Sequence, residues 1–141
     1  MEGQLTHSKR FTNSISAFEG YCKLYIDDLT HSKLSTFLKK NKQEIIELSG
    51  IEEGYFNRFC SKIISSRDYY VHANIKNNNI FSDFELLYIS FLLDILVAFN
   101  LLKQIEVPQD ILDMIINRAR ETYNGMQSFN RELSQDTFLD H

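Results

Sequence analysis

Residues 82–105 read SDFELLYISFLLDILVAFNLLKQI, and this stretch decides the fold class. Ser82 and Glu85 have the spacing of a capping box, in which each side chain accepts a hydrogen bond from the backbone N–H of the other residue. The segment 84–105 is apolar around nearly the whole circumference of an α-helix. We therefore predict a long helix that is either central in the fold or in contact with a second subunit.

The segments on both sides of this helix also repeat apolar residues at helical spacing, and Pro108 fits the first turn of a last helix. The predicted elements are two long helices over 8–29 and 51–73, a short helix or turn over 34–42, an exposed asparagine-rich loop over 74–79, and a last helix over 108–123. Ser49 and Gly50 have the composition of a break between elements. The sequence thus predicts an all-α protein.

With 141 residues, 43% of them hydrophobic and 24% charged, the chain has the size and composition of one globular domain. We expect a polar N-terminal segment over 1–8, a helical domain over 9–124 and a polar C-terminal tail over 125–141. The net charge of −4 disfavours broad, charge-driven binding of nucleic acid, because such binding needs clustered Lys and Arg. A small basic patch is still compatible with this charge.

Two further features point to the compartment. Cys22 and Cys60 fall inside apolar helical patterns, which is the usual setting of buried free thiols in a reducing compartment. Residues 1–9 are polar and show no secretory signal. The most apolar stretch, 86–97, contains Asp94 and is expected to be too short to span a bilayer. We expect a cytoplasmic protein with no membrane partner.

Arg67 falls in the middle of the apolar stripe of segment 51–73. A guanidinium that is buried without hydrogen-bond partners is strongly destabilising, so Arg67 needs a partner or a cleft. One interpretation is an ion pair with a carboxylate such as Glu19, which flanks the apolar stripe of the first helix. The other is a catalytic site, because Asp68 and His72 lie in the same short stretch.

His72 can exchange protons near neutral pH, and Asp68 lies four residues earlier, on the same helical face. That carboxylate can hold the imidazole in orientation. Arg67 and His72, however, point about 140° apart on a straight helix. The two side chains converge only if the helix ends or bends between them, or if a second subunit supplies one of them.

The end of segment 51–73 reads RDYYVH over residues 67–72. This run resembles the motif of HEPN domains, which consists of an arginine, a polar residue, three variable residues and a histidine. The runs RF at 10–11 and AFEGY at 17–21 also resemble the first helix of the ApeA-like HEPN group. The resemblance extends from Lys9 to about Arg120. Asp68 departs from the asparagine or histidine most expected after the arginine.

The resemblance implies a HEPN-like bundle of four to five helices that forms a homodimer, in which the two motif segments face each other across a shared cleft for RNA. It also implies an endoribonuclease that uses no metal and no cofactor. His72 would exchange protons with the ribose 2′ hydroxyl or the leaving oxygen, and Arg67 would stabilise charge on the phosphate. The expected product is a 2′,3′-cyclic phosphate. Toxins and phage-defence effectors occur in this family, which implies a role in host defence.

Further RNA contacts are expected from Arg58 and Lys62, which lie four residues apart on one helix, and from Tyr69, whose ring can stack on a base. Charged side chains on an exposed helical face are more often simply solvated. The alternative function is a non-catalytic HEPN domain that dimerises or binds RNA, as part of a larger protein. For a toxin, an antitoxin is the expected further partner.

Other classes of site find little support in the sequence. Asp28 and His31 imitate only distantly one of the Glu-x-x-His motifs that a di-iron bundle requires. Phosphate-binding glycine loops and Cys-His zinc spacings are missing from the sequence. His7 and His141 lie in the terminal segments, and we expect both to be exposed to solvent.

Overall fold

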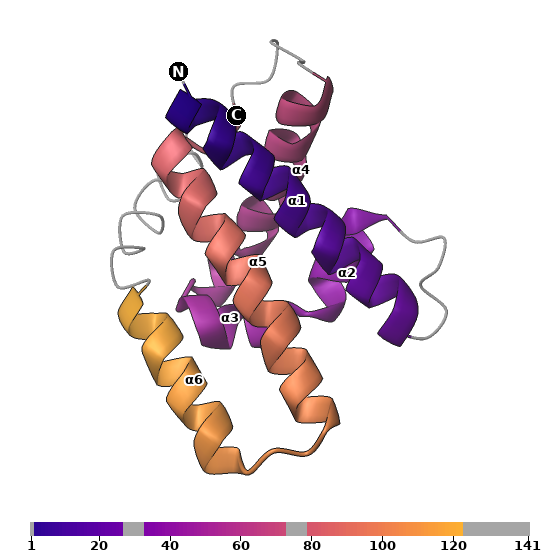
Figure 1. Ribbon diagram of the computed structural model, residues 1–141, viewed down its shortest axis with the longest axis vertical. Coiled ribbons are helices and arrows are strands. Elements are labelled where there is room, and N and C mark those ends of the chain that lie inside the picture. Colours follow the sequence, from indigo (N-terminus) through magenta and orange to yellow (C-terminus); the bar gives the residue numbers. More distant parts are fainter. Residues whose placement is uncertain (1, 27–32, 73–78, 123–141) are drawn as a thin grey trace.

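The computed structural model describes residues 2–26, 33–72 and 79–122. The helices in these ranges are α1 (Glu2–Tyr25), α2 (Leu34–Lys40), α3 (Lys42–Ser49), the short 3₁₀ helix η1 (Glu53–Tyr55), α4 (Phe56–His72), α5 (Asp83–Gln104) and α6 (Gln109–Thr122) (Figure 1). The described part of the chain contains no strand. The all-α class predicted from the sequence is therefore confirmed.

Helix α5 is the centre of the bundle. Figure 1 shows α1 and α5 in front, α6 beside α5, and α2, α3 and α4 behind them. Helix α5 contacts α1, α3 and α6. Its inner side is fully buried and consists mainly of Leu86, Ile89, Leu92, Leu93, Leu96 and Phe99. The predicted central position of this helix is thus confirmed.

The capping box at the start of α5 is also present. The backbone N–H of Ser82 donates to Glu85 Oε1 at 2.7 Å, and the backbone N–H of Glu85 donates to Ser82 Oγ at 3.4 Å. These two bonds satisfy donors that would otherwise be unpaired at the helix N-terminus. The start of α5 is therefore set by two side chains that are three positions apart in the chain, which is why the sequence alone identifies it.

The apolar stretch of α5 is longer than the sequence analysis allowed. This helix has 22 residues and an average hydropathy of 1.9 over its most apolar window, enough in length and composition to cross a membrane. The expectation that the stretch is too short is wrong, because the apolar run extends beyond 86–97 on both sides. Asp94 interrupts it, and its inner side forms the core with α1, which is the pattern of a central helix in a soluble bundle.

Two helices begin at other residues than predicted, and one helix was not predicted. The helix expected from residue 51 is α4, which begins at Phe56 after η1. Helix α1 begins at Glu2 rather than near Ser8, and ends at Tyr25, while the predicted end near Leu29 lies outside the described residues. Helix α3 was not predicted as a separate element, because its eight residues carry too short an apolar stripe. Gly50, with φ of 74°, ends it in the left-handed conformation, so the predicted break is confirmed. Most of the asparagine-rich loop, residues 73–78, lies outside the described residues.

Candidate functional site

The candidate site lies in the last turns of α4, and its geometry depends on which face of that helix is buried. Ser66 is completely buried, and its hydroxyl accepts a hydrogen bond from the backbone N–H of Phe81 at 2.8 Å. The Arg67 side chain is 31% exposed. Arg67 therefore lies at the edge of the buried face, and the prediction that it occupies the middle of that face is wrong.

The physical reason is that Ser66 replaces an apolar residue in the buried stripe. Phe59, Ile63 and Ser66 follow one another at spacings of four and three, and all three are buried. When the buried stripe is defined by its apolar residues alone, it leaves out Ser66. Its centre is then placed too close to Arg67. It also includes Val71, which is 52% exposed.

Arg67 is held by two carboxylates. Its Nη1 lies 3.6 Å from Glu19 Oε1 on α1, and its Nε donates to Asp68 Oδ1 at 3.3 Å. The ion pair with Glu19 that the sequence suggested is therefore present. No described residue forms a hydrogen bond or ion pair with the remaining terminal nitrogen, Nη2. The guanidinium is thus anchored on two sides, and one of its nitrogens is left for another acceptor.

His72 is the last residue of α4, and its side chain lies outside the part of the chain that the structure describes. The helix does not end between Arg67 and His72. Positions 67 and 72 lie about 140° apart around the helix axis, and a gentle bend of the helix does not bring them to the same side. Of the expected ways to bring Arg67 and His72 together, an end of the helix between them is therefore excluded. The expected contact between Asp68 and His72 likewise falls outside the described side chains.

The residues expected to contact RNA have different environments. Lys62 is only 7% exposed, and its Nζ lies 5.4 Å from the centre of the Phe81 ring. The expectation that Lys62 lies on an exposed face is wrong, because this position of α4 packs against Phe81. Arg58 and Tyr69 are partly exposed, and the Tyr69 ring meets Tyr70 edge to face at 4.8 Å.

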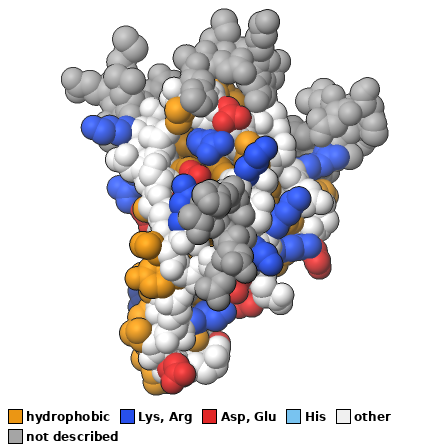
Figure 2. Space-filling model, turned by 90° about the vertical axis from the view of Figure 1, so that its right-hand side faces the viewer, with side chains coloured by type: hydrophobic (Ala, Val, Ile, Leu, Met, Phe, Trp, Pro, Cys, Tyr) orange, Lys and Arg blue, Asp and Glu red, His pale blue; other side chains and the backbone are white. Residues whose placement is uncertain are grey.

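Lysines and arginines gather on one side of the molecule in spite of the net negative charge. Figure 2 shows this face, which carries many basic side chains and few acidic ones. Helix α2 lies on the same side in Figure 1, and its last turn carries the exposed Lys39 and Lys40. Such a face can attract a polyanion at short range, although the charge of the whole chain does not.

A histidine–carboxylate pair lies close to the end of α4 and was not predicted. His7 Nδ1 on α1 is 3.0 Å from Asp83 Oδ2 in the first turn of α5. Asp83 Oδ1 is buried and has no hydrogen-bond partner among the described residues. Burial, followed by the charges of Tyr69 and Asp83, raises the pKa of the neighbouring Tyr70, whose hydroxyl donates to Phe81 O at 3.5 Å. The expectation that His7 is exposed to solvent is therefore wrong.

Sequence reasoning missed this pair because His7 and Asp83 are separated by 76 positions in the chain. Their contact depends on the register in which α1 packs against α5. The only sequence signal is that Asp83 lies in the capped first turn of a predicted helix, where an acidic residue is favoured by the helix dipole in any protein.

The two thiols are unsuited to nucleophilic chemistry. Cys22 and Cys60 are buried and free. Burial raises the pKa of Cys22 to about 11 and that of Cys60 to about 12, so both are protonated at neutral pH. The described residues also include no group of three or more His, Cys, Asp and Glu side chains that could hold a metal ion. Neither thiol, nor a metal cluster of such side chains, is therefore a candidate centre within the described ranges.

Comparison with known proteins adds one finding. The family model described as Apea-like HEPN matches residues 7–111, a range that contains most of α1, the whole of α2 to α5 and the whole RDYYVH run. No curated protein and no solved structure matches the chain. The family resemblance noted in the sequence is thereby confirmed.

Proposed function

Because the chain belongs to the Apea-like HEPN family, we propose that it is a metal-independent endoribonuclease that works as a dimer in the cytoplasm. Arg67, His72 and Asp68 form its catalytic group, and Glu19 supports Arg67. The biological role is that of a toxin or phage-defence effector, with RNA as substrate and an antitoxin or a larger parent protein as further partner. The observation that carries the proposal is the partly exposed Arg67 guanidinium, anchored by Glu19 and Asp68 with Nη2 left over.

The chemistry uses the RNA's own nucleophile. The 2′ oxygen of a ribose attacks the neighbouring phosphorus, and one His72 takes the 2′ proton. The bond from phosphorus to the 5′ oxygen breaks, and that oxygen takes a proton from the solvent, so each site needs one His72. Arg67 neutralises charge that develops on the phosphate oxygens. The products are a 2′,3′-cyclic phosphate and a 5′ hydroxyl, and DNA, which lacks the 2′ hydroxyl, is not cleaved.

Two observations support a shared cleft. Helix α4 continues through His72, so the helix does not end between Arg67 and His72, and a second chain is a way to bring the two residues together. Apolar side chains are also exposed near the motif segment: Val71 at the end of α4 is 52% exposed and Phe84 at the start of α5 is 75% exposed. Exposed apolar surface of this kind is typical of protein interfaces.

The alternative is a non-catalytic HEPN domain that dimerises or binds RNA as part of a larger protein. The observation that favours it is the pairing of Arg67 with two carboxylates, which is also the arrangement of a structural ion pair. In this alternative the basic face in Figure 2 binds RNA, and no bond is broken.

The test is to incubate the purified protein with RNA in the presence of a chelator and to analyse the ends of the products. We expect 2′,3′-cyclic phosphate ends from the wild-type protein. Arg67→Ala and His72→Ala should each lower the cleavage rate about a hundredfold or more, because each removes a group that acts in the transition state.

Matched controls are Arg120→Ala and His141→Ala, which remove an arginine and a histidine outside the matched range 7–111. Both should cleave at the wild-type rate. A cleavage rate that neither Arg67→Ala nor His72→Ala lowers would rule out the proposed site. Binding of RNA without any product, at every protein concentration, would favour the non-catalytic alternative.

A further inference from the structure

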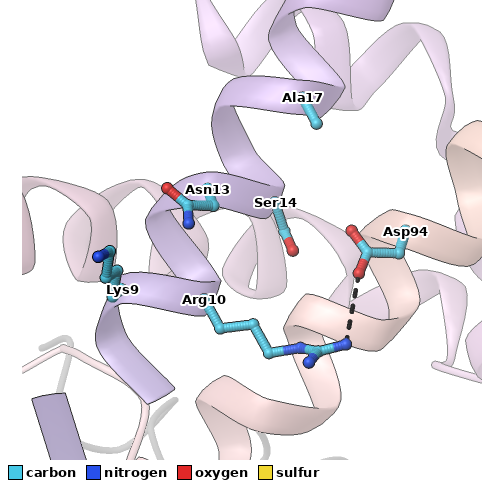
Figure 3. Close-up of a pocket in the computed structure, with 6 residues that line it drawn as sticks. All are labelled: Lys9, Arg10, Asn13, Ser14, Ala17 and Asp94. Carbon is cyan, nitrogen blue, oxygen red and sulfur yellow. Dashed lines mark ion pairs between the residues drawn. The ribbon is translucent and has the colours of Figure 1, made fainter. Parts of the chain in front are cut away.

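A second polar site lies where α1 meets α5, on the flank of α1 opposite to Glu19. At 100° per residue, Glu19 points about half a turn away from Arg10. The site is a groove of about 610 Å³ lined by Lys9, Arg10, Asn13, Ser14 and Ala17 of α1 and by Asp94 of α5 (Figure 3). It is therefore separate from the candidate site at Arg67.

Arg10 has a fixed position in this groove, and, among the described residues, its guanidinium still has free hydrogen-bond donors. Its guanidinium carbon lies 4.5 Å from the centre of the Phe91 ring, and its Nη2 lies 3.8 Å from Asp94 Oδ2. A distance of 3.8 Å is too long for a hydrogen bond, so the carboxylate attracts the guanidinium without occupying its N–H donors. About half of the Arg10 side chain is exposed. The donors of Arg10 are thus held in place and open to another acceptor.

Ser14 provides the second observation. The residue is only 4% exposed, and its hydroxyl makes no hydrogen bond to any residue that the structure describes. Figure 3 shows its oxygen directed toward the space between Arg10 and Asp94. The rest of the residue is buried, so the hydroxyl can reach only the space of the groove. It is therefore available to donate a hydrogen bond to a ligand that enters there.

The rim of the groove is also polar and open. Within the described ranges, neither the Lys9 ammonium nor the Asn13 amide has a hydrogen-bond or ion-pair partner. Both are exposed, on the α1 side of the groove. Lys9 and Arg10 together outweigh Asp94 by one positive charge. The groove thus combines two cations, an amide and a hydroxyl around a cavity with a small excess of positive charge.

We propose that this groove binds a phosphate group. Guanidinium, ammonium, hydroxyl and amide groups all donate to phosphate oxygens, and Arg10 presents the planar fork that grips two of them. The single excess charge matches a phosphate ester with one negative charge, and Ala17 leaves room for the group that the phosphate carries. The phosphate belongs to a nucleotide or to a nucleic-acid strand. This inference goes beyond the proposed cleavage reaction and does not depend on it.

The test is a binding titration of the full chain by calorimetry and by amide NMR shifts. All proteins carry Arg67→Ala, so that phosphate bound at the candidate cleavage site does not contribute. The probes are inorganic phosphate, adenosine 5′-monophosphate and a single-stranded DNA oligonucleotide, which keeps the phosphodiesters but lacks the 2′ hydroxyl. We expect saturable binding with shifts at Asn13, Ser14 and Ala17, and weaker affinity at higher salt.

Two substitutions should change the affinity for the phosphate probes in opposite directions. Arg10→Ala should weaken binding about tenfold or more, because it removes charge-assisted hydrogen bonds. Asp94→Asn should tighten binding about fivefold, because it removes a repulsive charge at a few ångströms in a solvated site. Ser14→Ala should weaken binding less than Arg10→Ala does. Lys23→Ala, a lysine exposed near the end of α1, is the control and should bind like the parent protein.

Saturation by phosphate or by the mononucleotide supports a small-molecule ligand, and saturation by the oligonucleotide alone supports a strand. The proposal is overturned if none of the three probes saturates the groove, or if Asp94→Asn fails to tighten binding. Because Asp94→Asn keeps the shape of the side chain, it remains informative even if Arg10→Ala perturbs the packing on Phe91. A negative result here leaves the cleavage test at Arg67 and His72 untouched.

Discussion

Arg67 is anchored between Glu19 and Asp68, and this determines what it can do for a phosphate. The side chains of the three residues are 31%, 22% and 44% exposed. Ion pairs this exposed contribute roughly 0–1 kcal/mol each, because water and salt screen them. A phosphate that approaches closely can therefore compete for the guanidinium. The carboxylates keep Arg67 in position when no phosphate is present.

Asp68 carries a negative charge next to the place where the proposed scissile phosphate is bound. We expect Asp68→Asn to raise the single-turnover rate of RNA cleavage about fivefold, because it removes one repulsive charge and keeps a hydrogen-bonding side chain of the same shape. The measurement is the rate at saturating protein. Asp110→Asn, an exposed acidic residue on α6, is the control and should leave the rate unchanged. A lower rate in Asp68→Asn would mean that catalysis needs the negative charge of Asp68 and not only its hydrogen bonds.

At the level of single elements, α5 has the strongest sequence signals at its start and an unusual end. The backbone N–H of Val107 donates to Leu102 O at 3.3 Å, and that of Glu106 donates to Lys103 O at 3.1 Å. These two bonds form a Schellman motif, which requires a left-handed residue after the helix. That residue is Glu106, with φ of 59°, where glycine is usual.

Glu106→Gly should therefore stabilise the protein by about 0.5–1 kcal/mol. In the left-handed conformation a glutamate has a steric penalty of about 1–2 kcal/mol, which glycine does not have. This penalty is larger than the extra conformational entropy, about 0.5–1 kcal/mol, that glycine loses on folding. Gly50→Ala provides the matched contrast. Gly50 ends α3 with φ of 74° and has open space around it, so alanine should destabilise by about 1 kcal/mol through the backbone alone. Urea denaturation measures both. Equal stability of Glu106→Gly and wild type would show that the left-handed turn carries no strain.

At the level of the whole molecule, α1 separates two sites that face different ways. One flank of α1 brings Glu19 to Arg67 on α4, and the other forms the phosphate groove with α5. A buried pair of amides connects α5 with the helices behind it. Asn100 Nδ2 on α5 donates to Asn41 Oδ1 at 2.8 Å, and Asn41 Nδ2 donates to Phe37 O at 2.8 Å. The corner between α2 and α3 is thereby attached to the central helix.

The proposed shared cleft predicts complementation between inactive chains. In a symmetric dimer that pairs Arg67 of one chain with His72 of the other, a heterodimer of Arg67→Ala and His72→Ala keeps one of its two sites intact. Random exchange of an equal mixture should therefore restore about a quarter of the wild-type activity. The measurement is RNA cleavage after the two variants are unfolded and refolded together.

Each variant refolded alone is the control for this experiment and should stay inactive. A mixture that stays as inactive as its components would contradict the pairing across two chains. Light scattering on the same samples measures the mass, and a monomer at every concentration would contradict the dimer itself.

The sequence by itself determined the features that depend on neighbours along the chain. The all-α class, the capping box of α5, the break at Gly50 and the RDYYVH run all rest on residues within a few positions of each other. The Glu19–Arg67 pair could also be predicted, because an arginine within an apolar stripe needs a carboxylate partner and Glu19 flanks the stripe of the first helix.

Only the tertiary structure decided how each helix is rotated about its own axis and which distant residues meet. Ser66 rather than Arg67 faces the core because Phe81 supplies a backbone N–H to its hydroxyl. His7 meets Asp83, and Arg10 meets Asp94, because α1 packs against α5 in one register. Periodicity gives the width of an apolar stripe but not its exact direction, since polar residues that find partners are buried as readily as apolar ones.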